Sequence, residues 1–508
     1  NSRISQEIPD FEVRPQQKRM MEFIVEAFNA DRISIIEAPT GVGKTIAYLL
    51  PAVDWSLKNR ERVVISTRTI NLQEQLMHKD IPLVAKCFEK PFLAVLVKGR
   101  GNYLCRRRFA RVLSETALFE DERKRDILRA IADWAEHTSD GSLSDLSFVP
   151  PRDLWTEICS EADSCRPSIC PNVQRCFLFQ ARKTIAKADV LVVNHHMLFS
   201  DLALRRELGR FDSLAVLPPY QRVILDEAHS IEDSATEFFG NEVSLLGVLS
   251  SLGRLYRLER QAERGLIHFL KMKIMGLPLK GKEFIWEGVV QSIDQRLIPS
   301  IELARTQVEA LFEHIRDFVS ESTTQIGHEV KFRLTPPILS NAAISEIKDV
   351  HLVPVAQDLQ DIATRIKYLL DHLLNASKNT ESEEDSTFRE DCIELQTLGA
   401  RLEQYALFMG TFLHPEPREN TVKWIEIDTK NPRLVRLIEC PLEIGPLLAE
   451  CFQATIKTAV MTSATLSVGG SFKFISKRVG LNLMSESHVG FESLDSPFNF
   501  MTQAIMCV

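Results

Sequence analysis

A glycine-rich loop that follows a short apolar run has the residue types and spacing needed to bind a nucleotide. Its sequence is Ala38-Pro39-Thr40-Gly41-Val42-Gly43-Lys44-Thr45. Glycines let consecutive backbone N–H groups turn toward a polyphosphate, and the N-terminus of a following helix adds positive potential. We expect Lys44 to reach the β- and γ-phosphates and the Thr45 hydroxyl to ligate Mg²⁺. An ordinary glycine turn is the alternative, and the Gly-Lys-Thr sequence between a strand and a helix argues against it.

Two adjacent carboxylates, Asp226 and Glu227, follow the apolar run 223–225. Carboxylates at a strand end are suited to hold the water shell of Mg²⁺ and to orient and deprotonate an attacking water. We therefore predict that Asp226 binds the magnesium and that Glu227 acts on the water. An Asp-Glu pair at a strand end is common by itself. Together with Lys44 and Thr45, it forms a constellation for nucleotide hydrolysis.

The elements that must position these residues alternate between strands and helices. Apolar or β-branched runs predict strands at 33–37, 62–67, 92–97, 188–194, 222–226 and 458–466. In an open α/β sheet, ligands bind outside the carboxyl ends of the strands. Thr67 and Arg68 are therefore placed to touch a phosphodiester backbone, although a helix-capping role for the hydroxyl is also compatible. The pattern predicts an α/β fold.

Length, composition and charge bound the function classes. The 508 residues should form roughly three domains of about 150 residues each. The content of hydrophobic (44%) and charged (26%) residues is typical of a globular protein in solution. The net charge of −8 gives no global basic field, so a nucleic-acid partner would be held by local patches. No apolar run approaches the roughly 18–20 residues that span a bilayer, and we expect a cytoplasmic protein.

Four cysteines form a candidate metal site: Cys105, Cys165, Cys170 and Cys176. Structural zinc prefers cysteine pairs two to four residues apart, supplied twice. The wider spacing here, with Pro167 and Pro171 restricting the backbone, fits the larger iron–sulfur cube better. Zinc stays open as an alternative, and Cys159 is a rival to Cys105 as the fourth ligand. Buried inert thiols are disfavoured because Cys170 and Cys176 have polar neighbours.

Two further stretches have side chains suited to ligands. Gln17 precedes the glycine-rich loop, and its amide could pair with an adenine edge as donor and acceptor, although a solvated glutamine is also compatible. The segment 98–108 places Arg100 and Arg106 beside an aromatic residue and a cysteine. Such basic side chains suit phosphate contacts.

The motifs, taken in order, resemble those of superfamily 2 helicases. Ala-Pro-Thr-Gly-Val-Gly-Lys-Thr, Asp-Glu-Ala-His (226–229) and Ser-Ala-Thr (463–465) look like motifs I, II and III. The four-cysteine insertion between motifs Ia and II narrows the resemblance to the XPD/DinG-type iron–sulfur helicases. The segments 98–105, 192–196 and 495–499 resemble the bacterial DinG/YoaA branch, and the resemblance covers nearly the whole chain.

This resemblance implies a RecA-like P-loop motor domain interrupted by a small iron–sulfur cluster domain and a helical arch domain. The expected boundaries are 1–100, 187–231 and 431–508 for the motor, 101–186 for the cluster domain, and 232–430 for the arch. The implied cofactors are ATP, Mg²⁺ and a [4Fe-4S] cluster. The implied activity is ATP-driven 5′→3′ movement of a monomer on single-stranded, forked or gapped DNA, in repair or at replication forks. Repair or replication proteins are implied partners.

The resemblance also assigns roles to residues. The ATP-binding set is Gln17, Thr40, Gly41, Val42, Gly43, Lys44 and Thr45. The cluster ligands are Cys105, Cys165, Cys170 and Cys176. His229 would couple hydrolysis to Ser463 and Thr465. The DNA contacts would be Thr67, Arg68, Arg100, Arg106, Asn194 and His195.

One departure from the family pattern and two alternative functions remain. The family's Gln-x-x-Gly-Arg-x-x-Arg motif is absent from this sequence, so we expect a fragment in which 504–508 begins a second motor domain. In such a fragment ATP turnover would not be coupled to unwinding. The run 381–391 is acidic and is predicted to be a solvated loop at a helix-hairpin tip. The alternatives are a non-catalytic single-stranded-DNA-binding adaptor and a cluster-containing nuclease.

Overall fold

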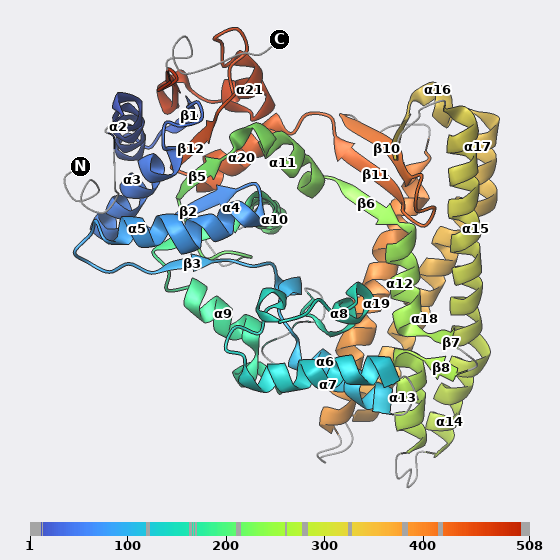
Figure 1. Cartoon of the computed structure of the whole chain (residues 1–508). Helices are drawn as coiled ribbons and strands as arrows, with labels where there is room; N and C mark the ends of the chain where they lie inside the picture. Colours follow the sequence, from blue (N-terminus) through green and yellow to red (C-terminus); the bar gives the residue numbers. More distant parts are fainter. Residues whose placement is uncertain are drawn as a thin grey trace.

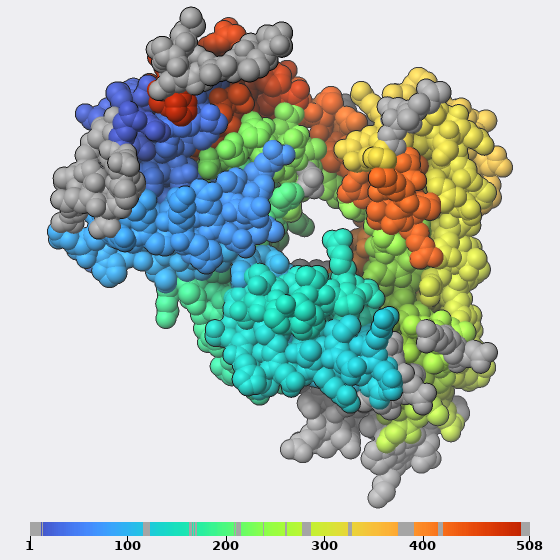
Figure 2. Space-filling view, viewed as in Figure 1, coloured from blue at the N-terminus to red at the C-terminus, as the bar shows by residue number. Residues whose placement is uncertain are grey.

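The computed structural model describes most of the chain, and its parts surround an opening. The described residues are 12, 14–117, 122–161, 165, 167, 170–209, 215–259, 262–276, 283–323, 328–377, 385–414 and 420–498. A parallel sheet with its helices lies on one side of the opening, a small helical domain lies below it, and long helices face the sheet across it (Figure 1). The space-filling view shows that side chains do not fill this opening (Figure 2).

The first part is a seven-stranded sheet, and every strand pairing in it is parallel. Its order is β13 (Val489–Ser493), β1 (Ile33–Glu37), β12 (Thr458–Ser463), β5 (Arg222–Asp226), β2 (Val63–Thr67), β4 (Val190–Asn194) and β3 (Ala94–Leu96). The strands predicted from apolar runs are confirmed. The edge strand β13 was not predicted, because its sequence contains no apolar run. Its residues are half-buried or exposed.

Helices cover both faces of this sheet, which explains why its strands read as continuous apolar runs. One face packs against α2 (Pro15–Asn29), α3 (Lys44–Asn59), α4 (Ile70–Gln75), η1 (Leu76–Asp80) and α5 (Ile81–Ala85). The other face packs against α10 (His195–Leu208), α11 (Ile231–Phe239), α20 (Gly445–Thr455) and α21 (Lys473–Arg478). Successive side chains alternate between the two cores, as the period of a strand requires: Ile35 joins one and Ile36 the other. The short helices η5 (Ala228–Ser230), η8 (Leu481–Leu483) and η9 (Glu486–His488) follow β5 or precede β13.

The second part is inserted between β3 and β4 and has a core of its own. Its elements are η2 (Arg100–Asn102), α6 (Arg106–Ala117), α7 (Glu122–His137), η3 (Leu143–Asp145), α8 (Arg152–Ile158), η4 (Val173–Arg175) and α9 (Phe177–Ile185). The core is small and includes Tyr103, Ile131, Trp155 and Phe177. We call residues 101–186 the cysteine domain, because the four candidate ligands belong to it.

The third part, the arch, is mostly helical. Its helices are α12 (Leu245–Leu255), α13 (Leu266–Met275), α14 (Glu283–Ser292), η6 (Ile293–Leu297), α15 (Ile298–Ser322), α16 (Pro336–Leu339), α17 (Ala342–Glu346), η7 (Ile347–Leu352), α18 (Val353–Ser377) and α19 (Asp385–Phe412). A small hairpin, β7 (Arg257–Glu259) with β8 (Ala262–Arg264), follows α12. The apolar stripes read from the sequence pack into one large core.

Two features of the arch correct the sequence-based expectation. An antiparallel sheet joins the arch to the motor, in the order β6 (Asn241–Ser244), β11 (Val435–Pro441), β10 (Thr421–Asp428), β9 (Glu329–Leu334). The expected boundary at residue 430 separates the paired strands β10 and β11, so it is wrong by about one strand. The acidic run is also not a loop throughout, because α19 already begins at Asp385 and Asp391 is buried against the Lys273 ammonium. Residues 381–384 lie outside the described residues, as do 504–508.

The arch and the cysteine domain meet through buried ion pairs that we call the clasp. Glu394 of α19 is almost fully buried and pairs with Arg107 (3.5 Å) and Arg111 (3.7 Å) of α6, and with Arg254 of α12. Glu161 lies 2.9 Å from the Arg254 guanidinium. The remaining members of the clasp are Arg108 and Arg401, both paired with Glu161. Although burial acts to raise the pKa of Glu161, these arginines lower it to about 2.

Within the described residues, no helix is both long enough and apolar enough to cross a membrane.

Candidate nucleotide site at the carboxyl edge of the parallel sheet

The glycine-rich loop connects β1 to α3 in a conformation that depends on its glycines. Gly41 and Gly43 have φ values of 88° and 83°, in the left-handed region that residues with a Cβ avoid. Gly43 is also the residue that precedes α3, so the helix N-terminus opens at Lys44 and Thr45. Between the glycines, the Val42 side chain is buried in the core, which anchors the loop.

The carboxylates after β5 face this loop, as the sequence predicted. The Lys44 ammonium lies 4.0 Å from Oε1 of Glu227. Asp226 accepts a hydrogen bond from the Tyr48 hydroxyl at 3.1 Å, and the same hydroxyl interacts with the side chain of Thr45. The two groups predicted to hold Mg²⁺, Thr45 and Asp226, therefore share one neighbour.

The electrostatics of the carboxylate pair favour a bound cation. Burial and the neighbouring charge of Glu227 raise the pKa of Asp226 to about 6, while Lys44 acts in the opposite direction. Burial and Asp226 also raise the pKa of Tyr48 well above its usual value, so that it remains a hydroxyl donor. A divalent cation at this point would offset the repulsion between the two carboxylates.

A hydrogen-bonded chain leads from Glu227 to β12 and to the end of β2. The Ser463 hydroxyl lies 3.3 Å from Oε2 of Glu227 and 2.9 Å from Nδ1 of His229. On its other side, Nε2 of His229 lies 3.3 Å from the Arg68 guanidinium. The contact predicted between His229 and Ser463 is therefore present. Thr465, predicted to share that role, is exposed.

Glu37, which sequence reasoning missed, ties the base of the glycine-rich loop to the segment after β12. Its carboxylate accepts hydrogen bonds from the backbone N–H groups of Leu466 (2.6 Å) and Ser467 (2.5 Å), and from the Ser467 hydroxyl (2.8 Å). Burial acts to raise the pKa of Glu37, but these bonds hold it below its ordinary value. The hydrogen bond between Glu37 and Leu466 joins residues 429 positions apart, so no local sequence pattern predicts it.

Side chains from both ends of the described chain lie on the glycine-rich loop. The Gln17 amide donates to the Gly43 carbonyl at 3.1 Å. Arg14 donates to the Gly41 carbonyl, and its guanidinium lies 6.0 Å from the centre of the Phe498 ring. That ring is so close to Gly41 that a Cβ there would meet it at 2.3 Å. Gln17 thus lies at the loop, while its predicted contact with adenine remains a prediction.

The residues predicted to contact DNA differ in their burial and in their contacts within the protein. The Thr67 and His195 side chains are fully buried, so they are not available to a strand of DNA and the prediction is wrong for them. Asn194 caps α10 by accepting a hydrogen bond from the N–H of Met197. Polar residues at a strand end can point into the protein as well as out of it, and the sequence did not show which.

Arg100 and Arg106, the two arginines near the cysteine domain that were predicted to contact DNA, are less exposed than Arg68. Arg106 donates to the Arg175 and Ala135 carbonyls and pairs with Glu136, and its contact with DNA remains a prediction. Arg100 is half-buried in η2. Arg68 alone among the predicted contacts is exposed at the carboxyl edge of the sheet.

The candidate cluster ligands share one neighbourhood. Cys165 and Cys176 pack against the core of the cysteine domain. Burial raises the pKa of the Cys176 thiol, and repulsion from Cys105, Cys165 and Cys170 raises it further. Among the residues that the structure describes, no group of three or more His, Cys, Asp or Glu side chains is placed to hold a metal ion. Ligation by these cysteines therefore stays a prediction.

Cys159 remains a rival to Cys105. Residues 104 and 159 form a β-bridge, and the N–H of Cys105 donates to the Ile158 carbonyl at 2.9 Å. Cys159 is buried, and burial together with nearby Glu161 and Cys105 raises the pKa of its thiol. Cys105 and Cys159 therefore lie near each other in the cysteine domain.

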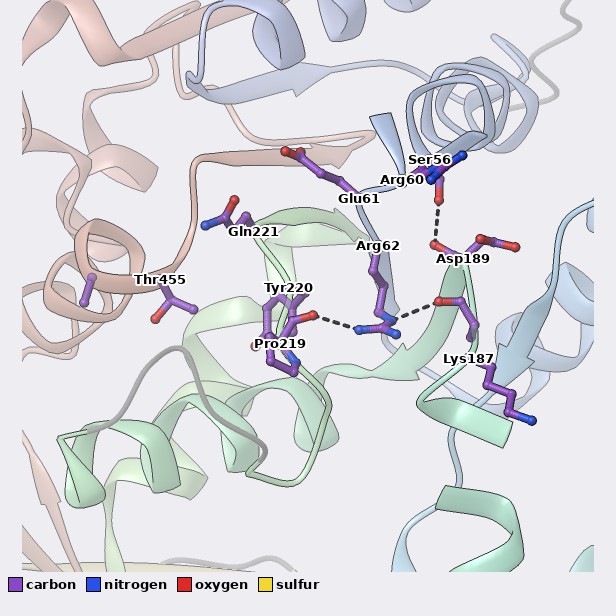
Figure 3. A pocket seen from close by; sticks show the side chains of 12 residues that line it. Ser56, Arg60, Glu61, Arg62, Lys187, Asp189, Pro219, Tyr220, Gln221 and Thr455 are labelled. Carbon is purple, nitrogen blue, oxygen red and sulfur yellow. Dashed lines mark hydrogen bonds between the residues drawn. The ribbon is translucent and has the colours of Figure 1, made fainter. Parts of the chain in front are cut away.

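A cavity of about 630 Å³ lies at the opposite, amino edge of the sheet (Figure 3). The Arg62 guanidinium fills part of its wall and donates to the carbonyls of Ala186, Ala188 and Pro219. Since ligands of open α/β sheets bind at the carboxyl edge, and since Arg62 already bonds three loops together, we assign this arginine a structural role.

Comparisons with known proteins find relatives with similar sequences. Residues 14–102 match the family model described as DEAD/DEAH box helicase. The chain is 28% identical over 510 residues to the "3'-5' exonuclease DinG" of Bacillus subtilis, covering 98% of this chain and 50% of that protein. It is 26% identical over 513 residues to the "ATP-dependent DNA helicase YoaA" of Haemophilus influenzae, covering 100% of this chain and 67% of that protein. The chain thus spans half to two thirds of these relatives.

A solved structure titled "XPD_Helicase" matches 95% of this chain and 62% of its own, with 13% identity and a TM-score of 0.42, which is too low to support an argument. The phosphate loop lies within the residues that match the DEAD/DEAH box helicase model, and the Asp-Glu-Ala-His segment lies beyond them. More narrowly, the chain is similar over nearly its whole length to helicases of the DinG/YoaA type.

Proposed function

We propose that this chain forms the ATP-binding part of an ATP-dependent DNA helicase that moves 5′ to 3′ along single-stranded DNA. The observation that carries the proposal is the convergence of Lys44 and Thr45 with Asp226 and Glu227 at one edge of the sheet. The direction of movement and a role in repair or at replication forks rest on the resemblance to the family. Single-stranded, forked or gapped DNA is the proposed substrate.

The contacts of the site suggest how it responds to a nucleotide. Without one, the Lys44 ammonium is balanced by Glu227. A bound triphosphate would draw Lys44 to the β- and γ-phosphates, while Thr45 and Asp226 hold Mg²⁺. Glu227 would then be free to orient the attacking water and to accept its proton.

The DNA path proposed here passes through the opening between the motor, the cysteine domain and the arch. Arg68 is exposed at the carboxyl edge of the sheet, and α4, which begins two residues later, lies beside this opening (Figure 1). Because Arg68 also contacts His229, a phosphate bound at Arg68 would act directly on the Asp-Glu-Ala-His segment.

For the cysteine domain we propose a [4Fe-4S] cluster on Cys105, Cys165, Cys170 and Cys176. Support comes from the proximity of Cys105, Cys165 and Cys170 to Cys176, because their charges as thiolates would raise the pKa of Cys176. Thiolates around one zinc ion, with Zn–S bonds of about 2.3 Å, must lie within about 4 Å of one another. Different iron atoms of a cube hold different thiolates, so their sulfurs lie farther apart. When bound, the cluster would stabilise a domain whose own core is small.

The test of the ATP site is binding of a fluorescent ATP analogue with Mg²⁺, together with ATP hydrolysis with and without single-stranded DNA. Lys44→Ala should weaken binding by at least about tenfold, because a charge-assisted contact to phosphate is lost. The matched control is Lys58→Ala, since Lys58 lies on the same helix and its pair with Asp54 is at the surface. Unchanged binding in Lys44→Ala would refute the proposal, and Mg²⁺-dependent DNA cleavage would favour the nuclease alternative.

The test of the cluster is an anaerobic visible spectrum. Iron–sulfur absorbs broadly near ~400 nm, whereas zinc is silent. Cys176→Ser should abolish the absorption, and Cys87→Ser, in a half-buried cysteine outside the domain, should not. Comparing Cys105→Ser with Cys159→Ser identifies the fourth ligand, because only the true ligand is needed for a full iron content.

A further inference from the structure

His195 lies where the ends of three neighbouring strands meet. It is the first residue of α10, directly after β4, and its side chain has no exposed surface. Its Nδ1 atom lies 2.7 Å from the hydroxyl of Ser66, near the end of β2. Since β2 lies between β4 and β5 in the sheet, the imidazole extends from β4 across the end of β2 toward β5.

The far side of the imidazole faces the main chain after β5. The backbone oxygens of Asp226 and Glu227 favour a proton on the ring, although burial outweighs them, lowers the pKa of His195 to about 4 and keeps the ring neutral. When the Ser66 hydroxyl donates to Nδ1, the single ring proton lies on Nε2. Among the described residues Nε2 has no hydrogen-bond partner, and a buried N–H in this position is costly. A small shift of the main chain at 226–227 would satisfy it.

The main chain at Glu227 is itself strained. Its φ and ψ are 55° and 47°, a left-handed conformation that residues other than glycine seldom adopt. Such a conformation persists only where the surrounding contacts hold it. The carboxylate of this residue is the group that faces Lys44 and Ser463.

We propose that His195 is a positioning residue for Glu227: the buried imidazole joins the end of β2 to the main chain at 226–227 and so fixes where the Glu227 carboxylate lies. Its effect on hydrolysis rests on the function proposed above, whereas the contact itself does not. A second connection runs outside the core, from Arg68 through His229. Ser66 and Arg68 belong to the same strand end, so movement of that end would reach Glu227 by a buried and an exposed route.

Amide hydrogen exchange of the protein without nucleotide tests the contact. In His195→Phe, which keeps a ring but removes both nitrogens, amides of residues 227–230 should exchange about tenfold faster than in the wild type. Ser66→Ala should change the same amides in the same direction by a smaller factor. The matched control is His196→Gln, because His196 is the next residue of α10 and is exposed. Amides of β1 and β12 should be unchanged in all variants, which separates positioning from general unfolding.

The same experiment with Mg²⁺ and a non-hydrolysable ATP analogue separates this proposal from the preceding one. Protection of amides 41–45 reports nucleotide binding and should appear in the wild type and in His195→Phe. Protection of 227–230 should appear only in the wild type. If 41–45 stay unprotected in both, the nucleotide site is refuted while the nucleotide-free result still decides the role of His195. Exchange at 227–230 within about twofold of wild type in both His195→Phe and Ser66→Ala would overturn the inference.

Discussion

The carboxyl edge of the parallel sheet and the clasp both gather charged side chains, but they hold them differently. At the sheet edge, the Glu227 carboxylate has the Lys44 ammonium 4.0 Å away and the Ser463 hydroxyl and the His229 imidazole each 3.3 Å away, and its backbone is strained. In the clasp, Glu394 and Glu161 each pair with three arginines. The comparison teaches that the first carboxylate is left able to change partners, whereas the other two are fixed in place.

The largest expected effect comes from removing the loosely held carboxylate. Glu227→Gln should lower single-turnover ATP hydrolysis by about 10²–10⁴-fold, because the amide cannot accept the proton of the attacking water. Binding of Mg²⁺ and the ATP analogue should persist. Asp233→Asn, an exposed carboxylate nearby on α11, is the control and should hydrolyse ATP at the wild-type rate. Equal hydrolysis in Glu227→Gln and wild type would remove Glu227 from the chemistry.

The next effect should come from breaking the clasp. Glu394→Ala would leave Arg107, Arg111 and Arg254 near one another without their shared counter-charge, which costs about 3–5 kcal/mol for a buried pair. Limited proteolysis and thermal unfolding should show a loosened contact between α6 and α19. The control is Glu450→Ala, because its pair with Arg206 is exposed and should contribute at most about 1 kcal/mol. Equal stability of the two variants would mean that the clasp does not hold the arch.

A smaller effect is expected at Glu37, whose carboxylate is held by hydrogen bonds from backbone N–H groups and a hydroxyl. Glu37→Gln keeps the shape but loses the charge that strengthens the bonds from Leu466 and Ser467, which we expect to cost about 1–2 kcal/mol. Hydrogen exchange at residues 466–467 should therefore rise. Glu443→Gln, whose partner Lys477 is exposed, should leave those amides unchanged. A wild-type exchange rate in Glu37→Gln would show that the charge is not needed.

The smallest effect is a pH dependence of the clasp. The pKa of Glu161 falls from 4.5 to about 2 in the folded protein, so its stabilising effect is complete above pH 4.5 and is lost as the pH falls toward 2. Small-angle scattering should detect a gradual loosening as the pH falls from 4.5 toward 2. Glu161→Gln should be looser already at pH 5 and should respond less to pH. Identical pH profiles would show that another group governs the change.

Sequence patterns predicted the phosphate loop and the central strands because both depend on neighbouring residues. Gly41 and Gly43 are required by local backbone angles, and buried strands of a parallel sheet are apolar on both faces. Glu37 and Tyr48 were missed because their partners, Leu466 and Asp226, are distant in sequence. Such contacts become visible only when the strand order is known.

Two other failures have a different physical cause. Thr67 and His195 were predicted to face DNA, but a strand-end side chain has an inward direction as well as an outward one, and packing decides between them. The strands of the arch were missed because the helical periodicity around them is long and strong, whereas β9 and β10 span only six and eight residues. Their pairing partners also lie far apart in the chain, up to 198 positions for Asn241 and Glu439.

The route of the backbone around the opening has a topological consequence. From the cysteine domain the chain returns to the sheet through β4, and it enters and leaves the arch through β6 and β11, which pair side by side. No peptide crosses from α6 to α19, so along the described backbone the loop of protein is closed at the clasp by side chains alone. On the proposed DNA path, a covalently circular strand could therefore enter or leave with every peptide bond intact. Glu161 and Glu394 would have to part from the arginines of the other domain, and Glu157 would have to part from Arg257.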